Sequence, residues 1–107
     1  MFEEYQKLVA LGKRLGLDVP KGTKLDALRP QVATRITEVL AGKGIVNGVT
    51  IRYDDEAGTH AGKRAEVVDT EVSWNLNIPF VTLRHEGTHK AHTFLAEPVV
   101  FHADVVR

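Results

Sequence analysis

The segment His85-Glu86-Gly87-Thr88-His89 has the residue types and the spacing of a zinc-binding motif. On an α-helix, two histidines four positions apart lie on one face, where both rings can bind Zn²⁺. The glutamate next to the first histidine can then activate a water molecule for hydrolysis. If this segment is helical, the sequence therefore offers a candidate catalytic site.

Residues 80–95, which contain this motif, fit a helix only in part. Apolar residues would form a stripe on such a helix, and Pro79 would suit its first position. Four β-branched residues lie in the segment, however, and Gly87 would stand near its centre. Both features disfavour a helix, because glycine in a helix interior is less stable than alanine by about 1 kcal/mol. A β conformation satisfies these residues better.

A β-hairpin accommodates the same residues. Gly87 suits the left-handed third position of a loop formed by residues 85–87, and this loop would place Leu83 opposite His89. His89 and His92 would then lie on different faces, so that no tetrahedral metal site forms. We therefore predict a hairpin that turns at this loop, with no catalytic residue, no metal and no cofactor. Zinc-dependent hydrolysis remains an alternative.

Lys21, Gly22, Thr23 and Lys24 form a second candidate site, for phosphate. Thr23 is expected to cap a helix, and the N-terminus of a helix presents unpaired amides and a partial positive charge. The two lysines lie beside that helix start, and the glycine lets a phosphate approach the backbone closely. This corner can therefore contact a nucleic-acid backbone. The alternative is a turn glycine, a helix cap and two solvated lysines.

Tyr53, Trp74 and Phe80 in the second half of the chain are predicted to form one aromatic patch for a partner. Tryptophan and tyrosine are enriched at the energetic centres of protein interfaces, because they combine a large apolar surface with a polar group. A lone tryptophan at a strand end is also common in a protein core or at its rim. The patch therefore has a structural reading as well as a binding one.

The composition limits the classes of function. With 107 residues, 43% of them hydrophobic, the chain has the size of one compact domain or two very small ones. The absence of cysteine excludes disulfides, thiolate metal sites and cysteine nucleophiles. No apolar stretch approaches the roughly 20 residues that span a bilayer, and the N-terminus is acidic, unlike a signal peptide. We expect a cytoplasmic protein without membrane contact.

The first part of the chain is predicted to form two helices. Residues 3–15 carry apolar side chains at three- and four-residue spacing, and Gly16 can end this helix in a left-handed conformation. The same period returns in residues 25–40, where Pro30 is expected to cause a kink or a break near residues 27–29. The residues predicted to be buried between the helices are Leu8, Leu11, Leu25, Leu28 and Ile36.

Beyond Gly44 the apolar pattern changes from helical spacing to alternation, which is typical of strands. Residues 54–62 and 75–79 are expected to be loops, because they are rich in turn-forming residues. Several short strands with turns between them favour a small barrel. The residues predicted to lie inside the sheet are Val49, Ile51, Val67 and Leu83, and the predicted strands cover residues 49–53, 65–74, 80–84, 88–95 and 99–106.

These patterns predict an α+β fold made of two parts. Residues 1–44 form a helix-loop-helix unit, and residues 45–107 form a small five-stranded, mostly antiparallel β-barrel or sheet. The whole chain has no net charge, which fits neither a strongly basic nucleic-acid binder nor an acidic mimic of DNA. The first part carries a charge of +3 and the second −3. This asymmetry suggests two surfaces with different tasks.

Residues 11–28, with the sequence LGKRLGLDVPKGTKLDAL, resemble the helix-extended-loop-helix modules of the SAP and HeH group. The matching features are a short amphipathic helix that ends in Gly-Leu, an extended loop with a proline, and Gly-Thr-Lys before a second helix. In that family the loop and the start of the second helix contact DNA, which implies contacts by Lys21, Gly22, Thr23 and Lys24. The second helix departs from the family pattern because it contains Pro30 and continues further.

The second part resembles an SH3-like barrel of the KOW or Tudor type in its layout. The shared features are five short strands, a long acidic loop after the first strand, and residues 62–68 opening the second. Barrels of this type bind nucleic acids, peptides or proteins through their loops, so the layout alone selects no function.

The leading hypothesis is a non-enzymatic binding module, such as a small phage or bacterial accessory protein. Its helices would contact nucleic-acid phosphates weakly, and its β-barrel would engage a protein partner or assist the nucleic-acid contact. One alternative is a protein-directed adaptor or inhibitor that binds no nucleic acid. The other is a compact zinc-dependent hydrolase.

Overall fold

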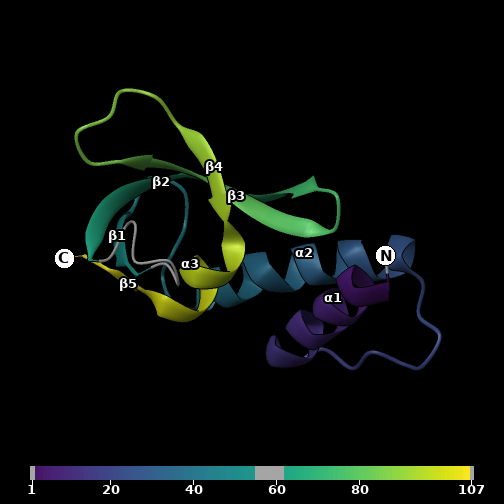
Figure 1. The fold of residues 1–107 in the computed structure, drawn as a ribbon. Helices are drawn as coiled ribbons and strands as arrows, with labels where there is room; N and C mark the ends of the chain where they lie inside the picture. The colour runs from purple at the N-terminus through teal and green to yellow at the C-terminus, as the bar shows by residue number, and fades with distance from the viewer. Residues whose placement is uncertain (1, 55–61, 107) are drawn as a thin grey trace.

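The computed structural model describes residues 2–54 and 62–106 of the chain (Figure 1). Most of the predicted loop 54–62 therefore lies outside the described residues. The elements, in chain order, are α1 (Phe2–Arg14), α2 (Leu25–Gly42), β1 (Thr50–Tyr53), β2 (Lys63–Asn75), β3 (Ile78–His85), β4 (His92–Leu95), α3 (Ala96–His102) and β5 (Ala103–Val105).

The five strands form one sheet in the order β4-β3-β2-β1-β5, and each neighbouring pair is antiparallel. The predicted α+β class, with two helices followed by a five-stranded antiparallel sheet, is confirmed. The sheet is open and not closed into a barrel, since β4 and β5 are its two edges.

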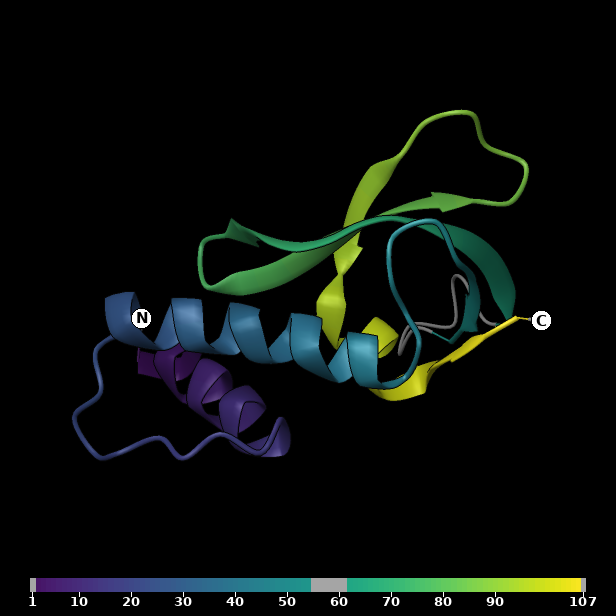
Figure 2. The same ribbon diagram turned by 180° about the vertical axis from the view of Figure 1, so that it is seen from behind.

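Helix α2 lies between α1 and the hairpin formed by β2 and β3 (Figures 1 and 2). Its buried side chains recur every four residues, so they form one stripe along the helix. Among the described residues, no helix is long and apolar enough to cross a membrane. The buried residues of α2 are Leu28, Val32, Ile36 and Leu40.

One hydrophobic cluster contains the buried residues of both predicted parts. The change from helix to strand comes after Gly44, as predicted, but side chains from both sides of this boundary share the cluster. The core prediction is confirmed for Leu8, Leu11, Leu28, Ile36, Ile51, Val67 and Leu83, whereas Leu25 and Val49 are half-buried at its rim.

Helix α3 is the main error in the predicted elements. The predicted strand over residues 99–106 is wrong for residues 99–102, which are helical, and only β5 remains of it. Proline is tolerated in the first helical turn, where Pro98 lies, because the first amides of a helix have no partner within it. Burial of the side chains against the core overrides the strand preference of valine. The buried residues of α3 are Ala96, Pro98, Val99 and Val100.

Pro30 does not break the second helix. Helix α2 is continuous from Leu25 to Gly42 and includes Pro30 as its sixth residue, so the predicted break is wrong and the alternative, a kink, stays a prediction. The ring is exposed, and the neighbouring Gln31 side chain donates a hydrogen bond of 3.1 Å to the carbonyl of Ala27. Packing of the apolar stripe of α2 thus outweighs the loss of one backbone hydrogen bond at proline.

The hairpin between β2 and β3 is tighter than the predicted loop over residues 75–79. Asn75 pairs directly with Ile78, so only Leu76 and Asn77 form the turn. Leu76 has a φ of 56°, a left-handed conformation that two-residue hairpin turns require at this position. The sequence contains no glycine there to signal the turn, which explains why the loop is predicted too long.

Candidate functional site

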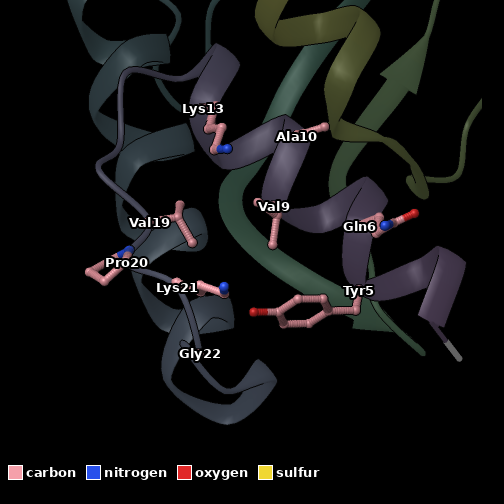
Figure 3. A pocket seen from close by; sticks show the side chains of 9 residues that line it. All are labelled: Tyr5, Gln6, Val9, Ala10, Lys13, Val19, Pro20, Lys21 and Gly22. Carbon is pink, nitrogen blue, oxygen red and sulfur yellow. The ribbon is translucent and has the colours of Figure 1, made fainter.

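A groove of about 530 Å³ lies between α1 and the loop that follows it (Figure 3). Two of the four residues predicted to contact phosphate, Lys21 and Gly22, line this groove. We call it the lysine groove. It is lined by Tyr5, Gln6, Val9, Ala10, Lys13, Val19, Pro20, Lys21 and Gly22.

The end of α1 turns the chain back to form the second wall of the groove. Gly16 has a φ of 86°, and its amide donates to the carbonyl of Lys13 at 3.0 Å. The amide of Leu17 donates to the carbonyl of Gly12 at 2.9 Å. This pair of hydrogen bonds is a Schellman motif, which satisfies the last carbonyls of the helix. The prediction that Gly16 ends the helix in a left-handed conformation is confirmed.

Two contacts hold the loop against α1. A Cβ atom at the buried Gly12 would lie 3.3 Å from Cγ2 of Val19, so the loop approaches the helix most closely where the helix has no side chain. Further along, the hydroxyl of Tyr5 donates a hydrogen bond of 2.6 Å to the carbonyl of Thr23. The groove is therefore built by packing and hydrogen bonding within the helical part.

Replacing Tyr5 with phenylalanine should loosen this wall. The change removes the hydrogen bond to Thr23 and keeps the ring, so we expect the free energy of unfolding to fall by about 0.5–1.5 kcal/mol. Amide hydrogen exchange in residues 17–24 should become faster than in the wild type. Unchanged exchange in this loop would contradict the assigned role of the hydroxyl.

The start of α2 differs from the predicted capping box. Lys24 occupies the N-cap position and makes no side-chain capping bond, so the prediction that Thr23 caps the helix is wrong. The hydroxyl of Thr23 instead donates to the carbonyl of Pro20 at 2.6 Å, and the Thr23 amide donates to the same oxygen at 3.1 Å. Gly22 has a φ of 88°, as the third residue of a type II turn requires. The turn therefore consists of residues 20–23, and the side chain of Lys21 is exposed on it.

The lysines around the groove have no carboxylate partner among the residues that the structure describes. The ion pairs found among the described residues are made by arginines, namely Arg14, Arg29 and Arg84. Lys13 and Lys21 are exposed and reach toward the groove from opposite walls, as Figure 3 shows. Lys24 is exposed just beyond the groove and is not among its lining residues. Their charge is therefore available to a bound anion.

Reasoning from the sequence missed the helical wall of the groove. Tyr5, Val9 and Lys13 follow one another at four-residue intervals, so they lie along one face of α1. That spacing is visible in the sequence. What the spacing cannot reveal is that the loop folds back over this face, because the return path depends on tertiary packing.

The predicted aromatic patch does not form. Tyr53 is 3% exposed and belongs to the core, whereas Trp74 is half-buried at the opposite end of β2. Trp74 pairs with Pro79, and the next residue of β3, Phe80, therefore faces the other side of the sheet. Of the three residues, Phe80 alone lies on the outer face and outside the core cluster.

The histidines of the H-E-x-x-H segment are separated by the hairpin. His85 ends β3 and is only 7% exposed, with Nε2 2.8 Å from the hydroxyl of Tyr53 and its ring packed edge-on against Phe94. His89 is exposed in the following loop. In residues 2–54 and 62–106, no group of three or more His, Asp or Glu side chains is arranged to hold a metal ion. The His85 ring is thus buried beside Tyr53 and Phe94.

The predicted hairpin is confirmed in its turn and wrong in its register. Gly87 has a φ of 87°, and the amide of Thr88 donates to the carbonyl of His85 at 3.0 Å. Leu83 pairs with His92, however, and not with His89. The connection is therefore longer than the predicted three-residue loop, and β4 begins at His92 rather than at residue 88.

The lysine groove combines two lysines, which have no carboxylate partner among the described residues, with the aromatic ring of Tyr5. Comparison of the chain with protein-family models, with curated proteins and with solved structures found no match.

Proposed function

We propose that the protein is a non-enzymatic binding module whose lysine groove holds a nucleic-acid strand. The observation that carries this proposal is that Lys13 and Lys21 face one groove from opposite walls without a carboxylate partner among the described residues. Phosphates bind where such cations can replace condensed counterions. Lys24 adds a third charge beside the groove.

The side chains that line the groove favour a single strand over a duplex. Its walls carry the ring of Tyr5 together with apolar side chains of Val9 and Val19, which suit the face of an unstacked base. Proteins that bind single strands without sequence preference combine a basic groove with aromatic rings in this way. A duplex keeps its bases stacked inside and would offer the groove only phosphates.

The proposed binding is weak and depends on salt. Three lysines can contact about three phosphates, and non-specific association of this kind has a Kd of about 10⁻⁴–10⁻⁶ M at physiological salt. The double-logarithmic dependence of affinity on salt should have a slope of about −0.7 per phosphate contacted on a single strand. A small accessory or regulatory protein in the cytoplasm fits such an affinity, since a partner can supply further binding energy.

Replacing both Lys21 and Lys24 with alanine should reduce the affinity for single-stranded DNA and RNA about tenfold at low salt. Each lost contact should make the salt slope shallower by about 0.7. Both side chains are exposed, so the unfolding midpoint should stay within error of the wild type. Fluorescence anisotropy with labelled oligonucleotides at several salt concentrations measures both quantities.

Lys90→Ala is the matched control, because it removes one exposed lysine from the loop between β3 and β4. This variant should keep the affinity and the slope of the wild type. Duplex DNA and duplex RNA should bind more weakly than the single strands. Binding that is absent for every oligonucleotide, or equal in the double variant and the wild type, would contradict the proposal.

A second candidate function, a protein-directed adaptor, has one observation in its favour. On the outer face of the sheet, Ile78 and Leu95 are 45% and 49% exposed. Ile78 lies two residues before Phe80 on β3, and Leu95 of β4 pairs with Phe80. Scattered apolar residues on a surface need no explanation, but a contiguous group is typical of an interaction site. If the wild-type protein binds none of the oligonucleotides in the test above, this adaptor becomes the better proposal.

A further inference from the structure

Arg52 and Arg64 form an unfavourable pair on the outer face of the sheet. They lie directly opposite each other on the antiparallel strands β1 and β2, and both are exposed. Like charges at opposed positions destabilise a sheet, because the two Cβ atoms are only about 4.5–5.5 Å apart. A local rule that is broken without compensation is typical of a functional site. We call these two residues the arginine pair.

The residues that the structure describes provide no partner for the arginine pair. Their ion pairs are made by Arg14, Arg29 and Arg84, and neither Arg52 nor Arg64 takes part in one. The arginine pair therefore places two uncompensated positive charges on neighbouring strands.

Two acidic residues lie at the ends of the same row, one strand further out on each side. Asp104 of β5 is opposite Arg52, and the amide of Glu86 donates to the carbonyl of Arg64 at 3.0 Å, just beyond the end of β3. A point midway between β1 and β2 is about 2.4 Å from the line of each arginine's strand and about 7 Å from that of each acid's strand. Because Coulomb energy falls with distance, an anion at this point is attracted by the arginines more strongly than the acids repel it.

A recess of about 330 Å³ opens at this end of the sheet. Arg64 lines it together with Arg84, which lies in the next row and forms an ion pair of 3.0 Å with Glu66. Thr50 of β1 lines it as well, and its hydroxyl can donate to an oxyanion. Small-molecule sites have volumes of about 300–1,000 Å³, so the recess is large enough for a small ligand. Glu86 and Thr88 also border it.

We propose that the arginine pair and this recess bind a phosphate monoester. A terminal phosphate carries a charge of about −1.5 to −2 at pH 7 and three acceptor oxygens, so it matches two uncompensated guanidinium groups. A phosphate inside a nucleic-acid strand carries a single charge, and a carboxylate is satisfied by one guanidinium fork. The ligand is therefore a small phosphomonoester or the phosphorylated end of a nucleic acid.

This site is separate from the lysine groove. The two share no lining residue, and β1 lies at the opposite end of the molecule from the start of α2 (Figures 1 and 2). The inference goes beyond the proposed function and does not depend on it. Variants of the arginine pair should accordingly keep the wild-type affinity for oligonucleotides that have no terminal phosphate.

Titration of the isotope-labelled full chain with methyl phosphate, followed by NMR, tests the site. Saturable shifts should concentrate in the amides of residues 50–52, 64–66 and 84–88. Dimethyl phosphate carries a single charge and should bind about fivefold more weakly at the same pH. The absence of saturable shifts in these segments, or equal affinity for the two probes, overturns the proposal.

Substitutions locate the ligand on the arginine pair. Arg52→Gln and Arg64→Gln should each weaken the binding of methyl phosphate about fivefold, because each removes one of the two charges. Glu86→Gln should strengthen it about twofold, since it removes a negative charge at the border of the recess. Lys7→Gln is the matched control: it removes one exposed positive charge from α1 and should bind like the wild type. Equal affinity in all four variants would overturn the assigned residues.

Two oligonucleotides of one sequence identify the source of the phosphate. One ends in a phosphate and the other in a hydroxyl. If the arginine pair binds nucleic-acid ends, the phosphorylated strand binds more tightly to the wild type, and Arg64→Gln removes this difference. If both strands bind equally while methyl phosphate binds, the ligand is a small phosphomonoester.

A double-mutant cycle separates this role from a structural one. Without phosphate, Arg52 and Arg64 should repel each other, and either single substitution already removes the repulsion. The double variant should therefore be less stable to urea at low salt than the sum of the two single effects predicts. An additive cycle, or a coupling of the opposite sign, would mean that the two side chains do not repel, and would overturn the proposal.

Discussion

Replacing Leu28 with alanine is expected to lower the free energy of unfolding by about 2–5 kcal/mol, a large share of the stability of a domain this small. Leu28 is fully buried in the stripe by which α2 joins the hydrophobic cluster. Alanine would leave a cavity, because the surrounding side chains come from elements that cannot all move inward. Urea denaturation measures the change.

Two spectroscopic probes should report the same shift for Leu28→Ala. Circular dichroism follows the helices, and the fluorescence of Trp74, the single tryptophan, follows β2. Both transitions should move together, because one cluster contains the buried residues of both parts of the chain. Glu38→Ala, at an exposed position of the same helix, should change the midpoint little. Transitions that separate would mean that the helical part and the sheet fold independently.

Replacing Tyr53 with phenylalanine is expected to lower the free energy of unfolding by about 1–3 kcal/mol. Its hydroxyl lies 2.8 Å from Nε2 of His85, and both residues are buried, with the His85 ring also against Phe94. Phenylalanine preserves the packing of the ring but removes this hydrogen bond between two buried side chains. The loss of a buried partner is more costly than the loss of an exposed one.

Tyr5→Phe is the matched comparison, because it removes a hydroxyl from a half-buried tyrosine in α1. The loss for Tyr53→Phe should be the larger of the two. A metal chelator should leave the unfolding midpoint of the wild type unchanged, as a structural role of His85 requires. A lower midpoint in chelator, restored by Zn²⁺, would support the zinc-dependent alternative.

The elements whose apolar residues recur at regular spacing were predicted well, because that spacing is visible within the segment itself. The stripe on α1, the end of that helix at Gly16 and the alternation in β1 and β2 each have a signal within a few residues. Gly87 likewise marks the turn after β3. Predictions failed where tertiary contacts opposed local preference. Val99 and Val100 are helical because this places their side chains in the core. Helix α2 continues through Pro30 because its other side chains are buried along one face.

The candidate site was predicted in part. Lys21 and Gly22 line the lysine groove, and Lys24 lies beside it, but Thr23 serves the turn and not the helix cap. The opposite wall, with Tyr5 and Lys13, was missed. The aromatic patch failed because one-residue alternation along β2 and β3 sends Trp74 and Phe80 to different faces, and a one-residue error in a strand reverses a side chain.

The sequence by itself determined the class of fold, the helical and extended parts, most of the core and the basic turn at Lys21, because each depends on periodicity or on local backbone preference. Only the tertiary structure decided the register of the hairpins, the helical state of residues 96–102, the open sheet and the pairing of the loop with α1. These features depend on contacts between residues distant in the chain, whose free energies exceed local preferences and leave no pattern at short spacing.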